Sequence, residues 1–246
     1  MGIEQLTVDY VEHSGSDISV VNAARVSFDK KSEALGHTGI GDGPMVPVVH
    51  DSDKNLIKYL ADHKHYSPFN HTFVTFRCSA PLFVMGQLKK HEYMPWNEIS
   101  RRYIDSEPEF YTPDVWRGRS VDKKQGSTGT VEGSWSGNAK LLYADCLWNY
   151  KGMIDNGVCP EQARMVLPQA MMSTWVWSGT VKAVAKMCKL RCEPDTQYES
   201  RIIAEKISEH MYTLFPVSWS ALMGTNHPHI RPMTDEERQR AKEKAA

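Results

Sequence analysis

The stretch from Pro81 to Tyr111 contains the side chains best suited to chemistry. Cations and a histidine come first, then an Asn-Glu pair and a run of donors: Lys89-Lys90-His91, Asn97-Glu98 and Ser100-Arg101-Arg102-Tyr103. Asn and Glu can exchange hydrogen bonds with a heterocycle or sugar, whereas Ser and Arg suit a phosphate. The mixture therefore favours a ligand with a polar ring and an anion. The alternative is a solvated basic helix end, since Lys and His complement a helix C-terminus.

A helix should lead into this cluster of polar residues. Pro81 suits a first helical turn, and Leu82, Met85 and Leu88 continue at helical spacing. Met94-Pro95 should end the helix, because proline disfavours helix in the residue before it and lacks the N–H for the next bond. Residues 97–103 would then lie on a loop or short strand.

The rest of the chain predicts a mixed fold of helices and strands, an α/β (α+β) class with a central sheet and long helices. Strands are expected at 5–12, 72–78 and 171–177, and helices at 18–28, 53–66, 139–156, 160–168, 180–190 and 197–214. Two Gly-rich stretches without apolar periodicity, 30–48 and 117–138, are expected to be loop insertions. The second could be a lid, although an inert surface loop is favoured. A single domain over 1–233 and a polar tail over 234–246 follow from this division.

Composition limits the class of protein. The 246 residues carry a formal net charge of −1, so there is no global field that would attract nucleic acid or an acidic membrane. The 5 cysteines are an odd number, which is typical of reduced thiols in a cytoplasmic protein. Neither a signal peptide nor a membrane span is indicated.

Two groups of residues could suggest a metal site. His63, His65 and His71 lie within a short segment, and Cys188 and Cys192 are four apart on an expected helix. No HExxH motif or second cysteine pair accompanies them, so no metal is predicted and the cysteines are interpreted as small core residues.

At the first cluster the sequence resembles the flavin-dependent thymidylate synthases (ThyX family). Their signature is Arg-His-Arg, two residues, Ser, one residue, Asn-Glu, one residue, Ser, one residue, Arg-Tyr. The same register here reads Lys90-His91-Glu92, Pro95, Asn97-Glu98, Ser100 and Arg102-Tyr103. The departures are Lys90, Glu92 and Pro95, which lie in the half of the motif that contacts flavin in the family.

Further blocks match the family in the same order along the chain. They are Ala23 to Phe28, His65 to His71 with Ser67 and Asn70 as departures, Pro160 to Pro168, and Leu190-Arg191. The resemblance implies an FAD-dependent enzyme that methylates dUMP to dTMP with methylenetetrahydrofolate and NADPH. It also implies a homotetramer with sites shared between subunits, working in the cytoplasm, or in the host cytoplasm if the chain is viral.

The resemblance also implies roles for individual residues. Arg191 would be catalytic, contacting the pyrimidine and helping to ionise its N3, and Arg102 and Arg164 would bind the dUMP phosphate from different subunits. The implied dUMP residues are Gln87, Lys90, Glu98, Ser100, Arg101, Arg102, Arg164 and Arg191. The implied FAD residues are Ser27, His65, Ser67, Lys90, His91, Glu92, Asn97, Glu98, Lys182 and Lys186.

Two other interpretations compete with this one. A single-stranded nucleic-acid-binding module could use the basic pairs with Trp96 and Tyr103 as stacking surfaces, but the near-zero net charge disfavours it. A protein with the same fold and altered or lost activity is the other, because Glu92 and Pro95 replace residues that the family uses.

Overall fold

The computed structural model describes residues 2–39, 45–104, 106–121 and 126–224. They form two compact units. Of the described residues, the first unit comprises those within 2–15 and 70–207, and the second those within 16–69 and 208–224. The expected tail at 234–246 lies outside the described residues, and the single domain over 1–233 stays a prediction.

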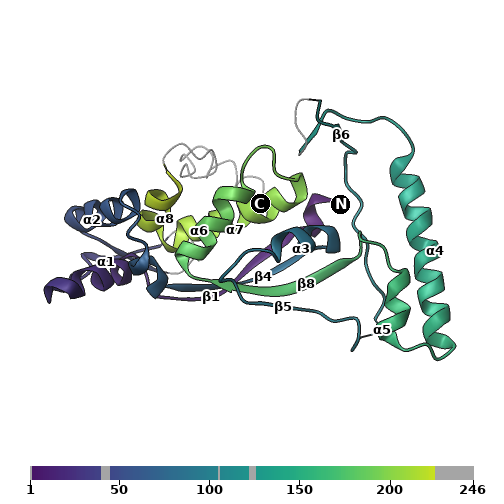
Figure 1. Ribbon diagram of the computed structural model, residues 1–246, viewed down its shortest axis with the longest axis horizontal. Helices are drawn as coiled ribbons and strands as arrows, with labels where there is room; N and C mark the ends of the chain where they lie inside the picture. The colour runs from purple at the N-terminus through teal and green to yellow at the C-terminus, as the bar shows by residue number, and fades with distance from the viewer. Residues whose placement is uncertain (1, 40–44, 105, 122–125, 225–246) are drawn as a thin grey trace. The chain divides into compact units, whose positions relative to one another are not determined.

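An antiparallel sheet of four strands, in the order β1-β4-β8-β5, is the centre of the first unit (Figure 1). Its strands are β1 (Thr7–Ser14), β4 (Phe73–Pro81), β5 (Trp96–Glu98) and β8 (Met172–Gly179). Alternate side chains of β8 are buried, and in the register with β4 Trp175 lies opposite Cys78 and Trp177 opposite Phe76. This alternation is what a strand with one face on the core requires.

Two helices of the first unit differ from the sequence prediction: the one expected at 139–156 begins at Trp135, and the one expected at 160–168 ends at Ala163 and continues as a 3-10 turn. The helices of this unit are α3 (Leu82–Leu88), α4 (Trp135–Asp155), α5 (Pro160–Ala163), α6 (Val181–Arg191) and α7 (Tyr198–Leu214), of which α7 continues into the second unit. Single 3-10 turns lie at Ile3–Gln5 and Arg164–Val166. Figure 1 shows α3 and α6 over the same face of the sheet, and α4 beside α5.

The second unit consists of helices and one small hairpin. Its elements are α1 (Asp17–Arg25), η2 (Val26–Phe28), β2 (Gly36–Thr38), β3 (Val46–Val48), α2 (Asp51–Asp62) and α8 (Pro216–Met223), and η3 (Ser67–His71) continues into the first unit. Helix α2 packs on α8 and α1. The buried carboxylate of Asp17 accepts the backbone N–H groups of Val217 and Ser218, at 2.9 and 2.8 Å, and so caps the start of α8.

The mixed fold class is confirmed, and four details are corrected. Helix α3 ends at Leu88 rather than at Met94, because the chain turns so that Met94 can be buried. Pro81 ends β4 and is the N-cap of α3 rather than part of its first turn. The stretch 30–48 contains the β2–β3 hairpin, and in 117–138 a β6–β7 ladder (Gly118–Arg119, Ser127–Thr128) precedes α4.

Candidate active site

The last residue of α6 is held by the turn that follows α3. Arg191 Nε donates to His91 Nε2 at 2.9 Å, and Arg191 Nη2 donates to the backbone carbonyl of Gln87 at 3.4 Å. Thr180 begins α6 as its N-cap, with its hydroxyl accepting the N–H of Ala183 at 3.2 Å. Arg191 is thus the last residue of a capped helix, and His91 holds its guanidinium by a hydrogen bond.

His91 is a neutral hydrogen-bond acceptor at this point. Burial, followed by the charges of Arg191 and Lys186, lowers the pKa of His91 from 6.5 to about 4. Because Nε2 accepts a hydrogen bond, the single ring proton must be on Nδ1. The imidazole therefore orients Arg191 without adding a positive charge beside it.

Lysines on one face of α6 create a positive surface next to this pair. Burial, and then the charges of Lys189 and Lys186, lower the pKa of Lys182. Lys186 donates to Glu92 at 2.9 Å, and the hydrogen bond to Lys186 lowers the pKa of Glu92. The anion that departs from the family signature is thus paired with a cation that the helix supplies.

Tryptophan side chains contact the short strand that contains Asn97 and Glu98. Glu98 accepts from the indole N–H of Trp96 at 2.7 Å and from Lys89 at 3.2 Å. The Trp96 ring stacks on Trp175, with ring centroids 4.5 Å apart. Glu98 is therefore positioned by its neighbours, while Asn97 is exposed.

Of the two arginines that follow Ser100, one is buried and the other is exposed. Arg101 is buried and donates to the backbone carbonyl of Ser106, which places its charge within the loop. Arg102 is exposed, lies over the Tyr103 ring at 4.9 Å and donates from Nε to Ser100 at 3.4 Å. Of the two, Arg102 has the guanidinium that can reach an external anion.

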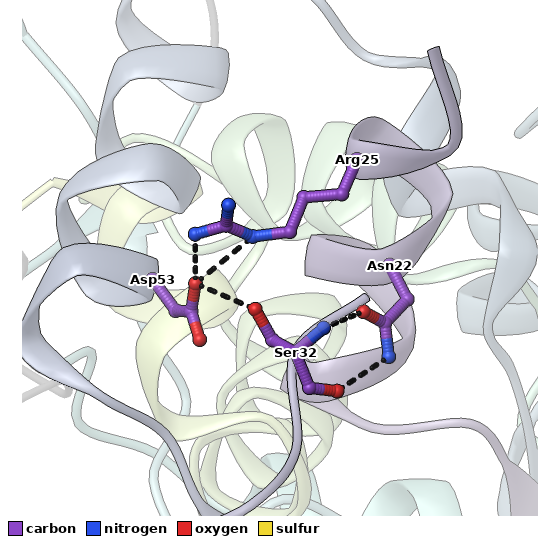
Figure 2. Close-up of polar contacts among 4 residues, drawn as sticks. All are labelled: Asn22, Arg25, Ser32 and Asp53. Atoms are coloured by element: carbon purple, nitrogen blue, oxygen red, sulfur yellow. Dashed lines mark hydrogen bonds and ion pairs between the residues drawn. The ribbon is translucent and has the colours of Figure 1, made fainter. Parts of the chain in front are cut away.

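A polar network in the second unit holds the turn with Ser27. Asp53 is 1% exposed, and its Oδ1 accepts from Arg25 Nη2 at 2.5 Å and from Ser32 Oγ at 3.1 Å (Figure 2). Asn22 makes two hydrogen bonds with the backbone of Ser32, at 2.7 and 3.0 Å. Ser27, in the 3-10 turn directly after Arg25, is exposed on an anchored segment.

The structure brings together some of the predicted residues and not others. Gln87, His91 and Arg191 meet, as do Glu92 and Lys186. Arg164 is exposed in the first unit and donates to the carbonyl of Glu161 at 3.3 Å. Ser27, His65 and Ser67 belong to the second unit and are exposed. Lys90 is exposed and adjoins His91.

Sequence reasoning missed Lys189, and it did not predict that Lys89 pairs with Glu98. Lys182, Lys186 and Lys189 recur at i, i+4 and i+7, which puts them on one helix face, so this spacing could have revealed the basic surface. No such spacing predicts the pairing of Lys89 with Glu98, because the turn after α3 brings these two residues together.

The described part of the chain shows neither a metal site nor a membrane span. There, no group of three or more His, Cys, Asp or Glu side chains is arranged to hold a metal ion. Within the same residues, no helix combines the length and apolar character needed to cross a bilayer.

Comparisons with known proteins identify the family of the chain. Residues 9–217 match the family described as thymidylate synthase complementing protein. A flavin-dependent thymidylate synthase of Thermosipho melanesiensis is 32% identical over 221 residues, which is 88% of this chain and 90% of that protein. One of Thermus thermophilus is 31% identical over 215 residues, covering 87% of this chain and 74% of that protein.

The fold is also similar to solved structures. A UMP/dUMP methylase, PolB from Streptomyces cacaoi bound with 5-Br dUMP, gives a TM-score of 0.76 at 28% identity, covering 92% of this chain and 97% of that chain. The same protein bound with 5-Br UMP gives a TM-score of 0.74 at 27% identity, covering 92% of this chain and 96% of that chain. The chain therefore belongs to the thymidylate synthase complementing protein family, and its relatives include flavin-dependent thymidylate synthases.

Proposed function

We propose that this protein is an FAD-dependent thymidylate synthase that converts dUMP to dTMP, with methylenetetrahydrofolate as carbon donor and NADPH as reductant. The family match over residues 9–217 carries the proposal. The methylases with the similar fold, crystallised with halogenated UMP and dUMP, support a uridine nucleotide as substrate. We place its work in the cytoplasm.

The dUMP site in this proposal uses charge for the phosphate and a fixed guanidinium for the base. Arg102 and Arg164, both exposed, bind the phosphate by forked hydrogen bonds. Arg191, held by His91, faces the pyrimidine and stabilises negative charge as it develops at N3. The other proposed dUMP residues are Gln87, Lys90, Glu98, Ser100 and Arg101.

The residues present fit FAD. Lys182 and Lys186 lie on one face of α6; burial, and then the charges of Lys189 and Lys186, lower the pKa of Lys182, and a diphosphate bound there would offset the repulsion among these cations. When bound, the flavin supplies reducing equivalents, and the protein groups bind and orient. The other proposed FAD residues are Ser27, His65, Ser67, Lys90, His91, Glu92, Asn97 and Glu98.

A homotetramer with shared sites is also proposed, and the surface of α4 supports self-association. Tyr150 is the buried side chain of this long helix, whereas Leu141, Leu142 and Trp148 are 69%, 56% and 76% exposed. Met165, close to Arg164 in sequence, is 79% exposed. Large exposed apolar residues gathered in this way are typical of protein interfaces.

Two measurements on the purified protein test the proposal. An absorbance spectrum should show flavin bands, and dTMP should form when dUMP, methylenetetrahydrofolate and NADPH are supplied. UMP, offered in place of dUMP, shows whether the 2′-hydroxyl is tolerated. A protein with bound flavin and no methylated product from either nucleotide would favour the alternative of lost activity.

A further inference from the structure

A recess lies in the first unit, lined by residues of α3, α4, α7, β7 and the segment before β6. Its volume of about 230 Å³ is below the roughly 300–1,000 Å³ typical of pockets for drug-sized ligands. None of the residues proposed above for dUMP or FAD lines it. The recess is therefore of a size for a fragment of one or two rings, and it is distinct from the proposed active site.

Aromatic side chains form much of its wall, and their polar tips are already bonded. Phe83 and Tyr111 meet edge to face, with ring centroids 6.0 Å apart. The Trp116 indole N–H donates to Ser136 at 2.8 Å, and the Tyr143 hydroxyl donates to the carbonyl of Tyr111 at 3.1 Å. The rings are thus fixed, and what they offer a ligand is apolar surface for stacking.

One buried carboxylate lines the same recess. The Glu199 side chain is 5% exposed, and its Oε1 accepts from Arg117 Nη2 at 2.5 Å and from the Tyr111 hydroxyl at 3.4 Å. Burial, and then the charge of Glu199, raise the pKa of Tyr111, so this phenol stays a donor. No described residue donates a hydrogen bond to the other oxygen, Oε2.

The charge of this carboxylate is already balanced. Arg117 supplies the countercharge, and its Nε is engaged by Ser127 at 2.9 Å. A ligand therefore need not be a cation. Oε2 is the carboxylate oxygen left for a ligand, and a neutral N–H donor can form a charge-assisted hydrogen bond with it.

We propose that this recess binds a small, flat, uncharged heteroaromatic amine, stacked on the aromatic wall and donating an N–H to Glu199 Oε2. Arg117 and Ser127 come from the stretch that the sequence presents as an inert insertion. In this proposal these two residues form part of one wall of a binding site. Nothing in it depends on the reaction proposed above.

The test uses 2-aminoquinoxaline as the probe, because it is neutral at pH 7, has two fused rings and carries an amino group. Quinoxaline is the matched control with the same rings and no N–H. Both are titrated into the full-length protein by saturation-transfer NMR, with dUMP and FAD present in excess. A hydrogen bond to a charged group predicts that the amine binds about ten-fold more tightly or better.

Two variants locate the binding. Ala170→Leu places a larger side chain at the wall of the recess and should abolish binding of 2-aminoquinoxaline. Glu199→Gln should reduce its advantage over quinoxaline, and if that variant does not fold, Ala170→Leu alone decides. The proposal is overturned if neither compound binds, if both bind equally, if Ala170→Leu binds as wild type does, or if dUMP or FAD displaces the probe.

Discussion

Arg191 Nε and His91 Nε2 are 2.9 Å apart, although the two residues are 100 positions apart in the chain. The imidazole accepts and the guanidinium donates, so the hydrogen bond fixes the plane of Arg191. A second hydrogen bond of Arg191, from Nη2 to the backbone carbonyl of Gln87, further restricts rotation of the guanidinium. His91 is in this view a positioning residue, and its effect on catalysis should pass through Arg191.

Two isosteric changes at His91 separate this role from simple packing. In His91→Gln the amide oxygen can take the place of Nε2 and accept from Arg191, whereas in His91→Asn the shorter amide reaches only as far as Nδ1. We expect His91→Asn to lose about ten-fold or more in kcat at saturating dUMP, and His91→Gln to retain most of it. Rates are normalised to bound flavin by absorbance. Equal losses in the two variants would contradict the positioning role.

The pKa of His91 predicts a pH dependence of stability. As pH falls below 6.5 the unfolded chain protonates His91, whereas the folded protein does not until about pH 4. The unfolded state then binds more protons, so the contribution of His91 to stability is lost as pH falls from about 7 to 4.

Urea unfolding of wild type and His91→Gln at pH 7.5 and 5 measures this effect. The wild type should lose more free energy of unfolding between the two pH values than the variant does. His71→Gln, at an exposed histidine, is the control. Parallel losses in wild type and His91→Gln would show that His91 titrates normally.

The Glu92–Lys186 pair predicts how tightly FAD is held. Both side chains are more than half exposed, so the pair is weak, but it competes with a diphosphate for Lys186. We expect FAD to be partly lost on purification, Glu92→Gln to bind it about two- to five-fold more tightly, and Glu92→Arg to retain still more.

FAD affinity is measured by quenching of flavin fluorescence in apoprotein titrations. Glu107→Gln is the matched control, because Glu107 forms an equally exposed ion pair with Lys151 at 2.7 Å. Equal or weaker FAD binding in both Glu92 variants would rule out competition at Lys186.

Much of the first unit could be predicted from the sequence, because its elements have strong periodicity. In α6, Val181, Val184, Ala185 and Cys188 are buried at the positions that helical spacing predicts. The β2–β3 hairpin could not be predicted, since strands of three residues are too short to show alternation. Helix α8 was not predicted.

The sequence indicated which residue types belong to the candidate site, but it did not indicate which of them form hydrogen bonds or ion pairs with one another. Family signatures identify Lys90-His91-Glu92 and Arg191, but they do not show that Arg191 donates to His91. Lys186 and Glu92 are 94 positions apart, so their pairing depends on how α6 packs beside the turn after α3. Local patterns cannot supply such long-range contacts.

The phosphate arginines make a prediction about oligomers. If Arg102 and Arg164 reach one phosphate from different subunits, each Arg→Ala variant should weaken dUMP binding by about 10- to 150-fold. Co-expressed with different tags and purified as mixed oligomers, the two variants should recover activity at low dUMP. Arg119→Ala, at an exposed arginine in β6, should behave as wild type. Verified mixed oligomers without recovery would contradict a shared site.

The central claim is methyl transfer to dUMP with Arg191 acting on the bound pyrimidine. Its most direct test supplies methylenetetrahydrofolate labelled with ¹³C in the methylene group, together with NADPH, FAD and saturating dUMP, and analyses the nucleotide by mass spectrometry. We expect dTMP carrying the label in its methyl group, and a turnover number for Arg191→Lys that stays well below wild type, because lysine keeps the charge but loses the planar fork. Wild-type protein that binds both FAD and dUMP and forms no labelled dTMP, or Arg191→Lys with the wild-type turnover number, would contradict the central claim.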